Sequence, residues 1–216
     1  GGVATETLML NEDTVWAGGP HDYADPGGAE VLPEIRRLIN EDRWVDAQRL
    51  ADERFMGRPT EQMQYQPVGD LLVEFPGLDG DAQEYRRSLD LTDAVTTTTF
   101  VVDGVRHTRE VFTSHADQVL VVRISAEEPG AVSFDARFRS LQETTVVGHD
   151  ERTLALEGRS GEAEGLEGEV RFVALARAVP DGGTATCDDT ALRVRGADAV
   201  TLLVSIGTSH RSYVDV

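Results

Sequence analysis

The feature that most constrains the fold is a two-residue alternation of apolar and polar side chains, which begins near Thr92 and continues toward the end of the chain. Its clearest instance places Val132, Phe134, Ala136 and Phe138 at every second position, with polar residues between them. Successive side chains of a strand point to opposite faces of the sheet, so the pattern predicts strands that each have one buried face.

Similar alternation recurs at residues 120–124 and 170–176, whereas residues 200–206 are nearly all apolar and predict a strand buried on both faces. Strands that each have one buried face can bury it when two sheets pack face to face. The sequence therefore predicts a mainly β fold, an antiparallel β-sandwich.

One hairpin is predicted together with its register. Asp103-Gly104 stands between two strand-like runs and suits the positive φ angles of a two-residue type I′ turn. A turn at these two residues places Phe100 across from His107.

A single stretch, near residues 29–56, departs from the β pattern because its apolar residues fall at helical spacings. We expect two short helices there, with Pro33 in the first turn of the earlier one and Gly57 closing the later one. The stretch is a helical insert in an otherwise β chain.

The domain count follows from length and composition. The chain has 216 residues, of which 40% are hydrophobic, and this is enough for a substantial core. No internal repeat or low-complexity linker divides it, so residues 1–216 are predicted to form a single domain.

Charge excludes two classes of partner. Asp and Glu number 39 against 20 basic residues, all of them Arg, which gives a formal net charge of −19. Such a chain repels phosphate backbones and anionic lipid headgroups, so we expect neither nucleic acid nor a membrane as a partner. A neutral sugar remains compatible with this charge.

No cofactor or metal is expected. Cys187 is the only cysteine, so thiolate clusters and intramolecular disulfides are excluded. The five histidines show no metal-ligand spacing, and neither a phosphate-binding glycine loop nor a nucleophile elbow occurs.

In so acidic a chain, two neighbouring carboxylates could form the catalytic pair of a glycoside hydrolase, because hydrolysis of a glycosidic bond needs two of them. The adjacent pairs are Glu12-Asp13, Asp150-Glu151 and Asp188-Asp189. Neighbouring residues on a strand point to opposite faces, and turns collect acidic residues for backbone capping. We therefore interpret these pairs as turn residues and nominate no catalytic residue.

Two clusters are unusual for a β domain. Residues 10–20 read LNEDTVWAGGP, and residues 63–71 read MQYQPVGDL, so that each combines an aromatic with polar and turn-forming residues. Such loops either pack against another domain or stack on and hydrogen-bond a sugar. The candidate site residues are Asn11, Glu12, Trp16, Gln64, Tyr65 and Gln66.

Both clusters resemble signature segments in the N-terminal domain of family 95 glycoside hydrolases, the group of the 1,2-α-L-fucosidases. Further similar segments follow in order at residues 32–36, 55–57, 85–91, 108–112, 198–203 and 208–213. The resemblance covers almost the whole chain. Val15 and Ala17 are conservative departures from the first segment.

The resemblance implies an N-terminal β-sandwich that packs on a catalytic (α/α)6 barrel, whose carboxylates and asparagines carry out inverting hydrolysis. None of that barrel is in this sequence, so the implied role is non-catalytic support of the barrel, with fucosylated oligosaccharide bound through the full enzyme. The resemblance also implies that the domain is incomplete at its N-terminus. A free-standing carbohydrate-binding module and an inactive remnant of a split gene are the alternatives.

Overall fold

The computed structural model describes residues 2–216, and its strands form two antiparallel sheets. The smaller sheet has five strands in the order β1-β2-β7-β12-β11. Their bounds are β1 (Thr5–Leu10), β2 (Gly69–Glu74), β7 (Val132–Arg139), β12 (Leu192–Ala197) and β11 (Thr184–Cys187).

The larger sheet has eight strands in the order β3-β4-β5-β6-β13-β10-β9-β8. Their bounds are β3 (Gln83–Asp90), β4 (Val95–Val102), β5 (Val105–Ser114), β6 (Val119–Ala126), β13 (Ala199–Thr208), β10 (Arg171–Asp181), β9 (Thr153–Arg159) and β8 (Glu143–Asp150).

The main hydrophobic core lies between the two sheets. Phe134 and Leu192 come from the smaller sheet and Phe172 and Leu202 from the larger one, and all four side chains are almost completely buried. In β2 and β7 every second side chain is buried in this core, as expected for strands with one face toward it. The predicted antiparallel β-sandwich is confirmed.

The β4–β5 hairpin is confirmed in detail. Phe100 pairs with His107, and Asp103 and Gly104 form the turn with φ angles of 49° and 82°.

The expectation for residues 200–206 was wrong. In β13 the side chains of Val200, Leu202 and Val204 are buried, whereas Leu203 is half-buried and Ser205 is exposed. The inner face of this strand packs in the core, but its outer face belongs to the outside of the sandwich. A nearly continuous apolar run therefore does not require two buried faces.

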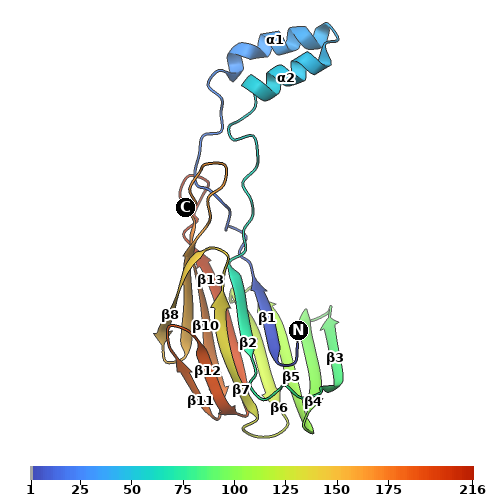
Figure 1. The fold of residues 1–216 in the computed structure, drawn as a ribbon, viewed down its shortest axis with the longest axis vertical. Helices are drawn as coiled ribbons and strands as arrows, with labels where there is room; N and C mark the ends of the chain where they lie inside the picture. The colour runs from blue at the N-terminus through green and yellow to red at the C-terminus, as the bar shows by residue number, and fades with distance from the viewer. Residues whose placement is uncertain (1) are drawn as a thin grey trace.

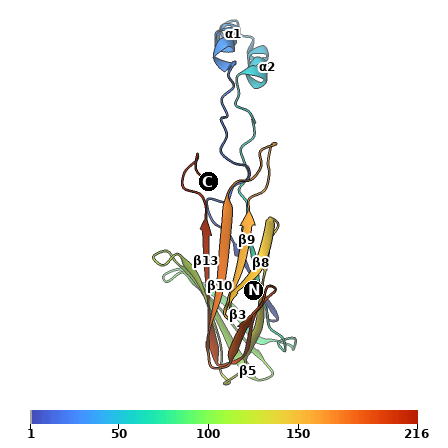
Figure 2. The ribbon, with the colours of Figure 1, turned by 90° about the vertical axis from the view of Figure 1, so that its left-hand side faces the viewer.

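The helical insert is confirmed as α1 (Gly28–Asn40) and α2 (Trp44–Arg54). It stands apart from the sandwich (Figure 1). Two extended segments, residues 11–27 and 55–68, connect it to β1 and β2, and we call them the stalk. Figure 2 shows the helices and the stalk continuing the long axis of the sandwich.

Backbone hydrogen bonds join the two segments of the stalk: Gln66 N to Val15 O (2.9 Å), Ala17 N to Gln64 O (2.9 Å) and Arg58 N to Tyr23 O (3.0 Å).

Pro33 does not lie in the first turn of α1. The helix begins at Gly28, directly after a turn in which Asp25 accepts hydrogen bonds from Gly27 and Gly28, and Pro33 is its sixth residue. Proline has no N–H to donate to the carbonyl of Ala29. Because Ala29 is exposed, water can hydrate that carbonyl, and the helix continues through Pro33.

In the part of the chain that the structure describes, neither helix has the length and apolar character required to cross a membrane.

Candidate functional site

The two sequence clusters lie side by side at the base of the stalk. Trp16 and Tyr65 form an isolated antiparallel bridge, and their rings meet edge to face with centroids 5.4 Å apart. The Trp16 indole donates to the carbonyl of Asp13 (2.9 Å), and the Tyr65 hydroxyl donates to the carbonyl of Glu12 (3.2 Å). The aromatic pair is thereby held in one orientation.

The environment of Tyr65 keeps its hydroxyl protonated. Burial, followed by the negative charges of Glu12 and Asp13, raises the pKa of Tyr65 above its ordinary value of 10.0. A phenol that stays neutral remains a hydrogen-bond donor, which is the role that it has toward Glu12.

The carboxylate of Glu12 organises its own loop. Its Oε2 accepts hydrogen bonds from the backbone N–H of Thr14 (2.8 Å) and from the Thr14 hydroxyl (2.5 Å). The same hydroxyl lies 2.6 Å from that of Thr208, at the end of β13. Glu12 therefore fixes the turn that connects β1 to the stalk and links it to the larger sheet.

Gln66 joins a third segment to the site. Its side-chain oxygen accepts a hydrogen bond from the backbone N–H of Gly161 (2.7 Å), and the carbonyl of Gly161 accepts one from Gly18 (3.0 Å). Asn11 and Gln64 are exposed, and Gln64 takes part through its backbone carbonyl.

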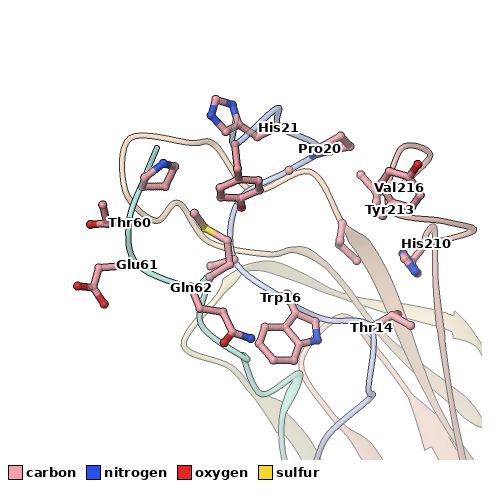
Figure 3. A pocket seen from close by; sticks show the side chains of 17 residues that line it. Thr14, Trp16, Pro20, His21, Thr60, Glu61, Gln62, His210, Tyr213 and Val216 are labelled. Carbon is pink, nitrogen blue, oxygen red and sulfur yellow. The ribbon is translucent and has the colours of Figure 1, made fainter. Parts of the chain in front are cut away.

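An open groove of about 790 Å³ lies at this end of the molecule. Figure 3 shows Trp16 and Gln62 on one side and His210, Tyr213 and Val216 across from them. The groove is lined mainly by apolar atoms, and Trp16 and Tyr213 are 38% and 86% exposed. Its surface can therefore pack against an apolar partner or stack on the flat face of a sugar.

Of the six predicted site residues, only Trp16 lines this groove. Asn11 and Glu12 border a separate groove of about 460 Å³ beside β1, which Leu120 and Val204 also line. Gln64, Tyr65 and Gln66 lie in the second segment of the stalk and bind it to the first segment and to Gly161.

Sequence reasoning missed the other aromatic residues of the groove. His21 and Tyr23 form an edge-to-face pair with centroids 5.1 Å apart, and the His21 ring nitrogen Nε2 lies 2.8 Å from the carbonyl oxygen of Arg58. His210 and Tyr213 follow β13. Their proximity to the first cluster depends on how the chain folds, although residues 208–213 already stood out as a segment of the resemblance.

The groove offers few side chains of the kind that catalyse glycoside hydrolysis. Among the described residues that line the groove, Glu61 is the one side-chain carboxylate, whereas glycoside hydrolysis needs two. The described residues also contain no group of three His, Cys, Asp or Glu side chains suited to a metal ion.

The adjacent acidic residues lie at turns, as expected. Asp188 accepts hydrogen bonds from the hydroxyl and backbone N–H of Thr190, and together with Arg193 these hold its pKa far below the ordinary value of 3.8. Asp150 accepts from the backbone N–H of Arg152, which lowers its pKa. Both carboxylates stabilise turns of the sandwich.

The fold and the groove define this chain as a β-sandwich domain with an open groove at one end, whose lining includes Trp16, Tyr23 and Tyr213. It belongs to the family described as "Glycosyl hydrolase family 65, N-terminal domain", whose model matches residues 1–213. This confirms the coarser part of the resemblance, an N-terminal domain of a glycoside hydrolase. The family number differs from that of the resemblance.

The curated relatives that match carry fucosidase names. The chain is 41% identical over 142 residues to "Alpha-L-fucosidase 2" of Arabidopsis thaliana, a match that covers 65% of this chain and 16% of that protein. "Probable alpha-fucosidase A" of Aspergillus oryzae is 27% identical over 56% of this chain and 17% of that protein, and the Aspergillus niger protein of the same name is 31% identical over 56% and 15%. The chain thus spans about a sixth of the length of the relatives that it matches.

Proposed function

We propose that this domain is the non-catalytic N-terminal part of a family 95 type α-L-fucosidase, in which it packs on a catalytic (α/α)6 barrel and supports it. The groove carries this proposal. It exposes Trp16 and Tyr213 on a base fixed by hydrogen bonds, and it offers an apolar surface without the carboxylate pair that catalysis requires. The fucosidase relatives support the choice of substrate class.

A Trp16→Ala variant tests the packing role. In the 216-residue chain alone, it removes an exposed edge-to-face contact with Tyr65, a loss of about 0.5–1.5 kcal/mol of unfolding free energy. In a polypeptide that joins this domain to the barrel, we expect a larger loss of stability and reduced hydrolysis of 2′-fucosyllactose. Thermal unfolding of both forms gives the comparison.

Leu91→Ala provides the control, because Leu91 is 85% exposed at the β3–β4 turn and does not line the groove. It should leave both forms unchanged. If Trp16→Ala affected the two forms equally, the indole would act only within the domain, and the packing role would be wrong.

A carbohydrate-binding module is the second candidate, because Trp16, Tyr23 and Tyr213 offer aromatic faces in one groove. Titration of the 216-residue chain with L-fucose and 2′-fucosyllactose separates the two. Saturable binding that Trp16→Ala abolishes would favour the module. Absence of binding by the isolated chain agrees with a packing surface.

A further inference from the structure

The helical hairpin formed by α1 and α2 has little to hold it in place. The two helices pack mainly on each other, and their shared core consists of Val31, Ile35, Leu38 and Ala47, with Leu50 and Ala51 at its border. Helices of this length are marginal in water without tertiary packing, and the stalk holds the pair away from the sandwich (Figure 1).

The end of the hairpin that carries the turn exposes apolar side chains. Ile39, Trp44 and Val45 flank the turn and are 39%, 59% and 81% exposed, and we call them the tip patch. Trp44 and Val45 adjoin Arg43, which together with Arg49 forms ion pairs with Asp46 at 2.7 and 2.9 Å. An aromatic centre with a polar rim is the usual composition of a protein interface.

The position of the hairpin indicates what covers it. The stalk, the groove and Val216 lie at the same end of the sandwich, so chain that continues from Val216 in a longer polypeptide starts beneath the hairpin (Figure 1). In the fucosidase relatives, the matched segment makes up only 15–17% of the protein. A large second domain attached at this end would start close to the groove and on the same side of the sandwich as the hairpin.

We propose that the hairpin is a docking arm whose tip patch is buried on the catalytic domain of the same polypeptide, at a site separate from the groove. This rests on the proposed function. The partner surface is an apolar hollow that accepts the Trp44 indole, and the stalk sets the distance between the two contacts.

The double substitution Trp44→Ser, Val45→Ser tests the arm in the 216-residue chain and in a polypeptide that joins it to the catalytic domain. Both side chains are largely exposed, so the 216-residue chain should keep its circular dichroism spectrum and melting temperature. In the longer polypeptide we expect tryptic cleavage after Arg49 and Arg54 to become roughly tenfold to a hundredfold faster, because the burial of both side chains is lost.

The matched control is Arg36→Ser with Gln48→Ser, which changes two exposed polar residues of the same helices. It should leave cleavage of the longer polypeptide at the wild-type rate. Equal cleavage of the wild type and the tip-patch variant would overturn the proposal. So would a 216-residue chain that is dimeric and becomes monomeric in the tip-patch variant, because the partner would then be a second copy.

The proposed function and the arm can fail separately. If Trp16→Ala impairs the longer polypeptide while the tip-patch variant behaves as wild type, the sandwich supports the barrel through the groove alone and the arm proposal is wrong. If neither variant has an effect, both are wrong.

Discussion

At the residue scale, Arg109 is the most deeply buried charged side chain among the described residues. Its side chain is 2% exposed, and the guanidinium lies 3.7 Å from the ring centre of Phe75. It donates hydrogen bonds to the carbonyls of Gly2 (2.7 Å) and Val3 (2.5 Å) and lies 3.7 Å from the carboxylate of Glu6. One buried cation thus anchors the segment that leads into β1.

We expect Arg109→Ala to lower the unfolding free energy by roughly 3–5 kcal/mol, because it removes the cation beside the buried Glu6 carboxylate and the donors to two carbonyls. Urea denaturation measures this. Arg159→Ala is the control, since Arg159 pairs with Glu143 at the surface and such pairs contribute about 1 kcal/mol or less. Equal losses in the two variants would contradict the anchoring role.

His107 makes the stability depend on pH. Burial, and then the positive charge of Arg109, lowers the pKa of His107 below 6.5. Below the unfolded-state pKa, the unfolded chain takes up a proton that the folded chain resists, so this contribution to stability is lost as the pH falls.

The His107→Phe variant keeps a flat ring next to Phe100, on which His107 stacks with ring centroids 5.3 Å apart, but it removes the titrating group. Between about pH 7.5 and about pH 5, wild type should lose more unfolding free energy than the variant. Parallel pH profiles of the two proteins would show that His107 is not the group responsible.

The candidate site illustrates what can be predicted for single residues. Trp16 and Tyr65 were both nominated from their sequence segments, but only Trp16 lines the groove, whereas the Tyr65 hydroxyl donates to the carbonyl of Glu12, which borders the other groove. Tyr23 and Tyr213 were missed, since their proximity arises from the stalk and from the end of β13. Local sequence identifies unusual residues, whereas the path of the chain decides which of them share a surface.

At the scale of elements, local chemistry was sufficient where one interaction dominates. The Asp103-Gly104 turn set the register of β4 with β5 because few residues tolerate positive φ. The helical spacing of residues 29–56 was equally decisive. The β13 prediction failed because an apolar run does not reveal whether a second layer covers it.

Substitution of two glycines with positive φ tests whether a steric clash adds to the cost of backbone strain. Gly104 has φ of 82° and open space where a Cβ would lie, so Gly104→Ala should cost about 1–2 kcal/mol through strain. Gly69 has φ of 150°, and a Cβ there would lie 2.5 Å from the carbonyl oxygen of Arg139 in β7. Gly69→Ala should therefore cost more, as measured by urea denaturation. The reverse order would contradict this account of the start of β2.

At the scale of the whole molecule, the sandwich could be predicted from sequence and the projecting hairpin could not. Alternation repeated over many strands leaves few architectures other than stacked sheets. The direction of the hairpin is set by the stalk, whose two extended segments have no periodic pattern and are joined by hydrogen bonds between residues far apart in sequence, such as Gln66 and Val15. The sequence indicates that an insert exists, but its position depends on these contacts.

The central claim is that this domain supports a fucoside-cleaving catalytic domain and performs no catalysis itself. Its most direct test is hydrolysis of 2′-fucosyllactose by the 216-residue chain alone and by the same chain joined to the proposed catalytic barrel. We predict activity only in the joined form. Hydrolysis by the isolated chain would mean that the domain carries its own catalytic carboxylates. If neither form hydrolysed 2′-fucosyllactose, the assignment to an active fucosidase would be contradicted and an inactive remnant favoured.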